Sequence, residues 1–475
     1  MNKKCQVFTP EENVIELLDK VGYEENLYGS KIIENACGDG NILKIIVKRY
    51  IEDCLERNFP KEKIKFGLES DIYGVEIDKN HYLKCLSNLN KLAGIYGIKN
   101  VLWKLFNIDT LKKKLDIKFD YVVGNPPYIK YRDLDNETRV FLRENYETCK
   151  IGKFDYCYAF IEASLNSLNE NGKLAYLIPN SIFKNVFAER LRNQILPYIK
   201  EIHDYKTKKL FNSALTSSAI IILDVKNKNK NIKYFDIVDN KICHIKKESL
   251  NRKWIFSNDI KKLKSKIKFS NYFKASISIA TQLNEAFVIK EYQEMEKYII
   301  VDNYKIEKKI IKETVSPRSM NYNKKELIIY PYYYDKNGNL ERYEEEEFRE
   351  KFPETTKYLS NFFQKLNERK SDASSKWFEY GRSQALRHLN NTKLLISTIV
   401  TKKVKVYELG KENIPYSGIY IISKNGNLLK KAKKVLESEN FYNYVQNIGI
   451  NASGTSLRIT PADINNYEFC EEEIY

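Results

Sequence analysis

Short runs of aliphatic and β-branched residues alternate with helix-periodic segments through the first half of the chain. The predicted strands are 31–34, 72–76, 119–123, 173–178 and 218–223, and the predicted helices are 14–21, 42–54, 77–94 and 154–168. Strands that alternate with helices are typical of a parallel sheet with helices on both faces. We therefore predict a doubly wound α/β domain, in which the loops at the carboxyl ends of the strands bind ligands.

Lysine-rich segments interrupt this pattern between residues 226 and 274, with dense runs at 226–230 and 261–268. Such runs favour a domain boundary. We predict a first domain at 1–245, a Lys-rich linker at 246–268 and a second domain at 269–475. The lysines fit a solvated linker or helix face as well as direct contact with phosphate.

Charge indicates what the protein binds. The 475 residues include 80 Lys and Arg against 63 Asp and Glu, a formal net charge of +17. Such an excess favours a polyanionic partner.

Other features exclude several classes of protein. No apolar run reaches the roughly 18 residues that span a bilayer, and the N-terminus leads into no hydrophobic signal region, so we expect a cytosolic protein. The eight cysteines and four histidines are scattered without metal-ligand spacing. We therefore expect neither a disulfide framework nor a metal site.

The loops after the first two predicted strands have the residues of a nucleoside site. Gly38 and Gly40 permit close backbone approach at a helix start, while Glu34 and Asp39 supply acceptors that would repel a pyrophosphate. A cationic or neutral nucleoside fits better. Glu76 ends the next strand, where a carboxylate can accept from both ribose hydroxyls. A purely structural glycine turn and a helix-capping acid are the alternatives.

A further acid and a proline-stiffened loop extend this edge of the sheet. Asp109 ends a short apolar run and could accept from an adenine amino group. The fourth strand delivers Asn125, Pro126, Pro127 and Tyr128. Because prolines fix φ, the Asn125 side chain and the Pro126 carbonyl can both point at one amino group while Tyr128 stacks on its ring.

At these residues the chain resembles the gamma-class adenine-N6 DNA methyltransferases, in which a Thr-Pro pair, a glycine-rich loop, a ribose acid and Asn-Pro-Pro-Tyr follow in this order. The resemblance implies a Rossmann-like methyltransferase domain and S-adenosylmethionine as cofactor. It implies catalytic roles for the loop 125–128 and stacking of Tyr128 and Phe211 on a flipped adenine. The implied cofactor-binding residues are Thr9, Pro10, Glu34, Ala36, Cys37, Gly38, Gly40, Glu76, Ile77, Asp109 and Asn125.

Stretches of the second half, at 277–287, 377–383, 394–399 and 453–459, resemble the target-recognition region of the same family. The resemblance implies a mixed α+β domain that binds double-stranded DNA. Arginine and lysine make most phosphate and base contacts in such complexes. Plain surface charge is the alternative for each of the predicted contacts, which are Arg382, Arg387, Lys402, Lys403 and Arg458.

Together these features predict a site-specific methyltransferase acting on N6 of an adenine flipped out of duplex DNA. We expect a monomer in the cytosol, associated with the nucleoid, and a restriction-modification or orphan role with any endonuclease encoded separately. Only eight residues precede Thr9, so we expect no nuclease domain in this chain. Methylation of RNA or of a protein glutamine by the same chemistry is one alternative, and a relic fold that only binds DNA is another.

Overall fold

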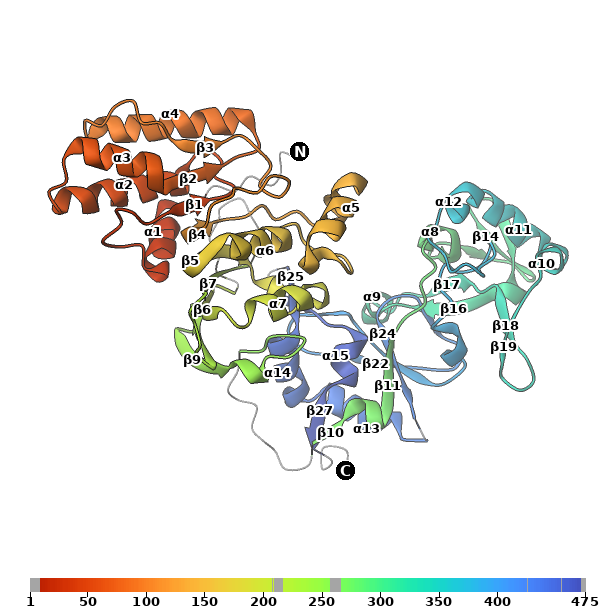
Figure 1. Ribbon diagram of the computed structural model, residues 1–475. Helices are drawn as coiled ribbons and strands as arrows, with labels where there is room; N and C mark the ends of the chain where they lie inside the picture. The colour runs from red at the N-terminus through yellow and green to blue at the C-terminus, as the bar shows by residue number, and fades with distance from the viewer. Residues whose placement is uncertain are drawn as a thin grey trace. The chain divides into compact units, whose positions relative to one another are not determined.

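The computed structural model describes residues 9–206, 208, 217–256, 266–424, 426–453 and 455–470. The chain divides into two compact units, Met1–Ile260 and Lys261–Tyr475 (Figure 1). The division falls inside the segment 246–268 that the sequence predicts as a linker. Part of that segment is nevertheless packed, because Leu250 and Trp254 are buried in the core of the first unit. These two residues therefore belong to the first unit although they lie within the predicted linker.

The described residues of the first unit contain a nine-stranded sheet of order β3-β2-β1-β4-β5-β7-β6-β8-β9. The strands β3, β2, β1, β4 and β5 pair with one another in parallel, and β7 is antiparallel to both β5 and β6. The strands are β1 (Ile32–Glu34), β2 (Ile72–Val75), β3 (Lys104–Phe106), β4 (Phe119–Gly124), β5 (Leu168–Pro179), β6 (Ile199–Asp204), β7 (Ser218–Asp224), β8 (Asn231–Asp236) and β9 (Lys241–Lys246).

Helices cover both faces of this sheet. Along β5, Leu174 and Tyr176 pack into one core while Ala175 and Leu177 pack into the other, as the two-residue period of a strand requires. Figure 1 shows α2, α3 and α4 beside the β1 to β3 end of the sheet. The helices are α1 (Glu11–Val21), α2 (Asn41–Glu56), α3 (Lys61–Asp71), α4 (Lys79–Ile95), α5 (Asn136–Asn145), α6 (Cys157–Ser167) and α7 (Glu189–Ile195).

The doubly wound α/β prediction is confirmed, and all five predicted strands and four predicted helices are present. The predicted helix 77–94 begins two residues late, at Lys79, because Asp78 is its N-cap and accepts from the backbone amides of Asn80 and His81. The sequence pattern missed β3, whose three residues include a single buried one, Leu105. A strand this short has no periodicity to detect.

The second unit is a mixed α+β domain of several small sheets, as predicted. Its core is aromatic, with Phe348 stacked on Phe378 at 4.1 Å between ring centroids and with Tyr330, Tyr332 and Tyr380 in mutual contact. The tyrosine-rich segment at 330–334 is therefore largely packing. No helix in the described ranges is long and apolar enough to cross a membrane.

The strands of the second unit are β10 (Lys266–Lys268), β11 (Phe273–Ile277), β12 (Val288–Ile289), β13 (Gln293–Glu294), β14 (Tyr298–Val301), β15 (Tyr304–Glu307), β16 (Ile311–Val315), β17 (Glu326–Ile329), β18 (Tyr332–Tyr334), β19 (Leu340–Arg342), β20 (Lys393–Ile396), β21 (Ile399–Val400), β22 (Val406–Leu409), β23 (Ile414–Pro415), β24 (Ile419–Ser423), β25 (Ile450–Ser453), β26 (Ser456–Arg458) and β27 (Glu468–Cys470). Its helices are α8 (Asn284–Phe287), α9 (Pro317–Asn321), α10 (Glu345–Lys351), α11 (Pro353–Ser360), α12 (Phe363–Asn367), α13 (Leu429–Leu436), α14 (Glu439–Ile448) and α15 (Pro461–Asn465).

Candidate functional site

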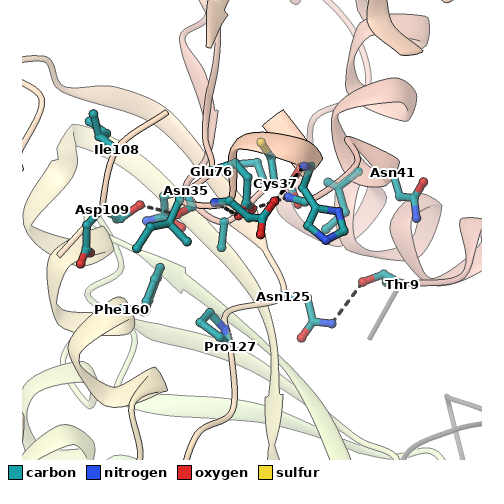
Figure 2. Close-up of a pocket in the computed structure, with 18 of the residues that line it drawn as sticks. Thr9, Asn35, Cys37, Asn41, Glu76, Ile108, Asp109, Asn125, Pro127 and Phe160 are labelled. Carbon is teal, nitrogen blue, oxygen red and sulfur yellow. Dashed lines mark hydrogen bonds between the residues drawn. The ribbon is translucent and has the colours of Figure 1, made fainter. Parts of the chain in front are cut away.

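A pocket of about 670 Å³ lies where β1, β2 and β4 end at the same edge of the first unit's sheet. In Figure 2, Asn35, Cys37 and Glu76 lie along one side of the pocket, and Phe160, Pro127 and Asn125 lie along the other. Parallel neighbours bring their carboxyl ends together, so the loops predicted to bind a ligand meet in one cavity.

Glu34, the last residue of β1, is a buried acid in the pocket wall, with a side chain only 3% exposed. No donor in the described part of the chain lies within hydrogen-bond distance of its Oε2. Burial raises the pKa of this carboxyl well above its usual range. The neighbouring Cys85 raises it further, and a hydrogen bond from the Leu43 backbone amide offsets only part of the increase. A buried acceptor without a partner suits a cationic or hydrogen-bond-donating ligand.

Glu76 follows β2 and joins two loops of the pocket. Its Oε2 accepts from the Gly38 backbone amide and its Oε1 accepts from the Asp78 backbone amide, each at 2.8 Å. The sequence predicts that both oxygens accept from ribose hydroxyls. Each oxygen can accept a second hydrogen bond. The carboxylate can therefore hold the loops together and still bind a diol, a role that stays a prediction.

The start of α4 adds a polar group that the sequence analysis did not select. His81 lines the pocket, and its Nδ1 lies in short contact with the Asp39 carboxylate. The Asp39 carbonyl in turn accepts from Asn88 Nδ2 at 2.9 Å. Asp39 is thus bound to α4 and is not among the residues that line the pocket. The sequence predicts that it accepts from the ligand, which stays a prediction. His81 lies three residues after Asp78, so the two share one face at the start of the predicted helix. That spacing could have predicted His81 as a lining residue.

Asn35 anchors the glycine-rich loop through three hydrogen bonds. Its side chain donates to Ser164 Oγ at 2.8 Å and accepts from the Tyr176 hydroxyl, and its carbonyl accepts from Thr110 Oγ1. These partners come from α6, β5 and the loop after β3. A network that joins residues more than 100 positions apart leaves no trace in local sequence spacing.

Asn125 follows β4 and makes hydrogen bonds at both ends of its carboxamide. Its Nδ2 donates to Thr9 Oγ1 at 3.2 Å, as the dashed line in Figure 2 marks, and its Oδ1 accepts from the Tyr128 hydroxyl at 2.6 Å. Thr9 is buried and lines the pocket. The structure thus brings the N-terminal Thr-Pro segment onto the Asn-Pro-Pro-Tyr loop, 116 positions away.

Most of the predicted site residues meet here. The pocket is lined by nine of the predicted cofactor-binding residues and by Pro127, whereas Pro10, Gly40, Pro126 and Tyr128 are not among its lining residues. Gly40 has φ +82° and caps α2, and a Cβ there would lie 2.6 Å from Cys85 Sγ, so this glycine serves the turn. Phe211 lies outside the described residues.

Several lining residues were missed because they stand next to the predicted motifs or on other elements. α6 and the segment before it contribute Tyr156 and Phe160. The remaining missed lining residues are Asn35, Asn41, Ile42, Asp78, Asn80, His81, Lys84, Ile108, Thr110 and Ile129. No group of three or more His, Cys, Asp or Glu side chains is placed to hold a metal ion in the ranges that the structure describes.

The five predicted DNA-contact residues are all exposed. Three of them gather at one small sheet, since Arg458 lies on β26, which pairs with β21, and Lys402 and Lys403 follow β21 closely. Arg382 donates to Asp372 at 2.6 Å, so its charge is partly neutralised. Arg387 lies apart, in a short 3-10 turn at Leu386–His388.

Comparison with known proteins finds similarity in the part of the chain that contains the pocket. Residues 26–211 match the model of the Eco57I restriction-modification methylase family. The chain is 28% identical over 254 residues to the type II methyltransferase M.BstVI of Geobacillus stearothermophilus, covering 49% of this chain and 45% of that protein. It is 25% identical over 334 residues to the restriction enzyme and methyltransferase RM.Eco57I of Escherichia coli, covering 61% of this chain and 33% of that protein.

The chain thus spans less than half the length of these relatives. Among solved structures, the type IIL restriction-modification enzyme MmeI in complex with DNA has a TM-score of 0.61 at 15% identity, covering 96% of this chain and 65% of that chain. This likeness concerns the fold. The matches agree with the family resemblance of the sequence motifs and support S-adenosylmethionine as the cofactor.

Proposed function

We propose, from the premise that residues 26–211 form an Eco57I-type restriction-modification methylase domain, that this chain methylates N6 of adenine in duplex DNA. The observation that carries the proposal is that the acids Glu34 and Glu76 and the loop residues Asn125 and Pro127 line the same pocket. The acids suit a cationic nucleoside, and the proline-stiffened loop suits a planar amine.

When bound, S-adenosylmethionine supplies an electrophilic methyl group. The chain's own task is to make a poor nucleophile attack, since the N6 lone pair of adenine is delocalised into its ring. The Asn125 side-chain oxygen and the Pro126 carbonyl would accept the two N6 hydrogens and favour a pyramidal nitrogen. Both acceptors are neutral, so they act by position and electrostatics. The target base must leave the duplex, at a cost of a few kcal/mol.

The second unit supports DNA as the substrate. Lys402, Lys403 and Arg458 place three exposed cations at one small sheet, and the net charge of the chain is +17. We infer that this sheet contacts DNA phosphates. That this chain acts as a monomer beside a separately encoded endonuclease is part of the same proposal.

The test incubates the purified chain with S-adenosylmethionine and unmethylated genomic DNA and then maps modified bases by single-molecule sequencing. We expect N6-methyladenine at one recurring motif. Unmodified DNA together with measurable cofactor binding would reject DNA as the substrate and direct the assay to RNA and protein glutamine. Absence of both methylation and cofactor binding would favour a relic fold.

Cofactor binding should release a proton from Glu34. Because burial raises the pKa of this carboxyl, it is protonated in the free protein at pH values where an exposed glutamate is ionised. A cationic ligand stabilises the carboxylate and lowers that pKa, so affinity should rise with pH up to the raised pKa and level off above it. Calorimetric titration in buffers of different ionisation enthalpy measures the released proton directly.

Glu34→Gln should abolish this pH dependence, because glutamine does not titrate. Glu52→Gln is the matched control: Glu52 lies on α2, away from the pocket lining, where it accepts from the Tyr96 hydroxyl at 2.8 Å. This variant should keep the wild-type pH profile. A binding heat independent of buffer in the wild-type protein would contradict the prediction.

A further inference from the structure

The Tyr128 hydroxyl lies between two acceptors. Its oxygen is 2.6 Å from Asn125 Oδ1 and 2.7 Å from the Leu177 carbonyl oxygen of β5. A phenol has one proton, so it can donate to only one of these acceptors at a time. Burial raises the pKa of Tyr128 well above its ordinary value, and the nearby Cys157 and Asp155 raise it further, so the hydroxyl keeps its proton.

The Asn125 carboxamide is therefore held from two directions. Thr9 Oγ1 accepts from its Nδ2 and Tyr128 donates to its Oδ1, so rotation of the amide by half a turn would require both hydroxyls to exchange donor and acceptor roles. In the proposed reaction the same Oδ1 must accept from the amine of the target base. The Tyr128 hydroxyl thus competes, in the free protein, for one of the two lone pairs of the oxygen that the substrate needs.

We propose that the Tyr128 hydroxyl is a placeholder donor, which orients the Asn125 carboxamide in the free enzyme and transfers its hydrogen bond to the Leu177 carbonyl when the amine of the target base arrives. This inference rests on the proposed function. The exchange needs only a rotation of the hydroxyl proton about the C–O bond, because Leu177 O is already within hydrogen-bond distance. Both lone pairs of Asn125 Oδ1 are then available to the amine without movement of the tyrosine ring.

This role is distinct from stacking, since the ring and the hydroxyl can be separated by mutation. Tyr128→Phe keeps the aromatic face and removes the placeholder. Asn125 would then be held by Thr9 alone, and the amide would spend part of its time misoriented. We assign Tyr128 as a positioning residue for Asn125 on this ground.

The experiment measures single-turnover methyl transfer by Tyr128→Phe at saturating cofactor and DNA. Loss of one net hydrogen bond is worth about 1 kcal/mol, so we expect the rate to fall roughly five- to tenfold with little change in KM for DNA. In an Asn125→Ala background the same substitution should have no further effect, because the residue on which it acts is gone. Tyr96→Phe, which removes a hydroxyl at the far end of α4, should match the wild type.

A second readout does not depend on methylation. In protein labelled with ¹⁵N-asparagine, the side-chain amide resonance of Asn125, assigned by its loss in Asn125→Ala, should shift or broaden in Tyr128→Phe and stay unchanged in Tyr96→Phe. A wild-type rate in Tyr128→Phe, an equal loss in the Asn125→Ala background, or an unchanged amide resonance would overturn the placeholder role. If the wild-type protein methylates no DNA but the resonance shifts, the proposed function fails while the contact stands.

Discussion

Asn125→Ala is expected to lower the single-turnover rate of methyl transfer by about 10²- to 10³-fold. Removing one preorganised hydrogen-bond partner of a developing charge typically costs about 3 to 4 kcal/mol. Asn125 is preorganised, because Pro126 and Pro127 stiffen the backbone that follows it and Thr9 and Tyr128 bind its side chain. We therefore expect a loss of this size. Its removal takes the acceptor away without changing the acids of the cofactor loops.

The measurement is transfer of labelled methyl groups to DNA, paired with calorimetric titration of the cofactor. Binding of S-adenosylmethionine should persist in Asn125→Ala, since Glu34, Gly38 and Glu76 remain. Asn90→Ala, which removes an exposed asparagine that accepts from Trp103 Nε1, should keep the wild-type rate. Methyl transfer by Asn125→Ala at the wild-type rate would contradict the proposed mechanism.

The sequence was sufficient to predict the residues at the strand ends. Glu34, Glu76 and Asn125 each follow a short buried run, and parallel strands bring such positions to one edge whatever the details of packing. The strand pattern therefore predicts that these residues share one edge of the sheet, as the lining of the pocket confirms. This logic reaches only residues within a few positions of a strand end.

Residues that act from elsewhere could not be predicted in this way. Tyr176 and Ser164 support the glycine-rich loop through Asn35, yet they lie in the middle of a strand and a helix and look like ordinary core positions. The raised pKa of Glu34 could not be predicted from sequence either, because burial and the lack of a hydrogen-bond donor to its Oε2 depend on tertiary packing. Sequence identifies the carboxyl, and only the fold shows that burial raises its pKa.

The direction of strand β7 is another property that the sequence pattern could not predict. Its apolar run at 218–223 predicted a strand, but the run carries no sign of direction, and β7 lies between β5 and β6 antiparallel to both. The order of the strands is a property of long-range pairing. For that reason the side of the site beyond β5 was less well predicted than the cofactor loops.

Glu76→Gln is expected to weaken S-adenosylmethionine binding roughly a hundredfold. Both carboxylate oxygens accept from backbone amides, of Gly38 and of Asp78, each at 2.8 Å. Glutamine has the same shape but presents one NH₂ group, so one of these two amides would face a donor. Hydrogen bonds to a charged group contribute about 1.5 to 3 kcal/mol each, and about 3 kcal/mol corresponds to the stated change in Kd.

The substitution should separate binding from chemistry. Because the loops after β1 and β2 would part while Asn125 stays in place, the rate at saturating cofactor should recover much of the wild-type value, and only KM for the cofactor should rise. Glu52→Gln, which alters one carboxylate hydrogen bond on α2, should leave both quantities unchanged. A fall in the saturated rate with unaltered Kd would instead assign Glu76 to the chemical step, and the two backbone hydrogen bonds would then be incidental to cofactor binding.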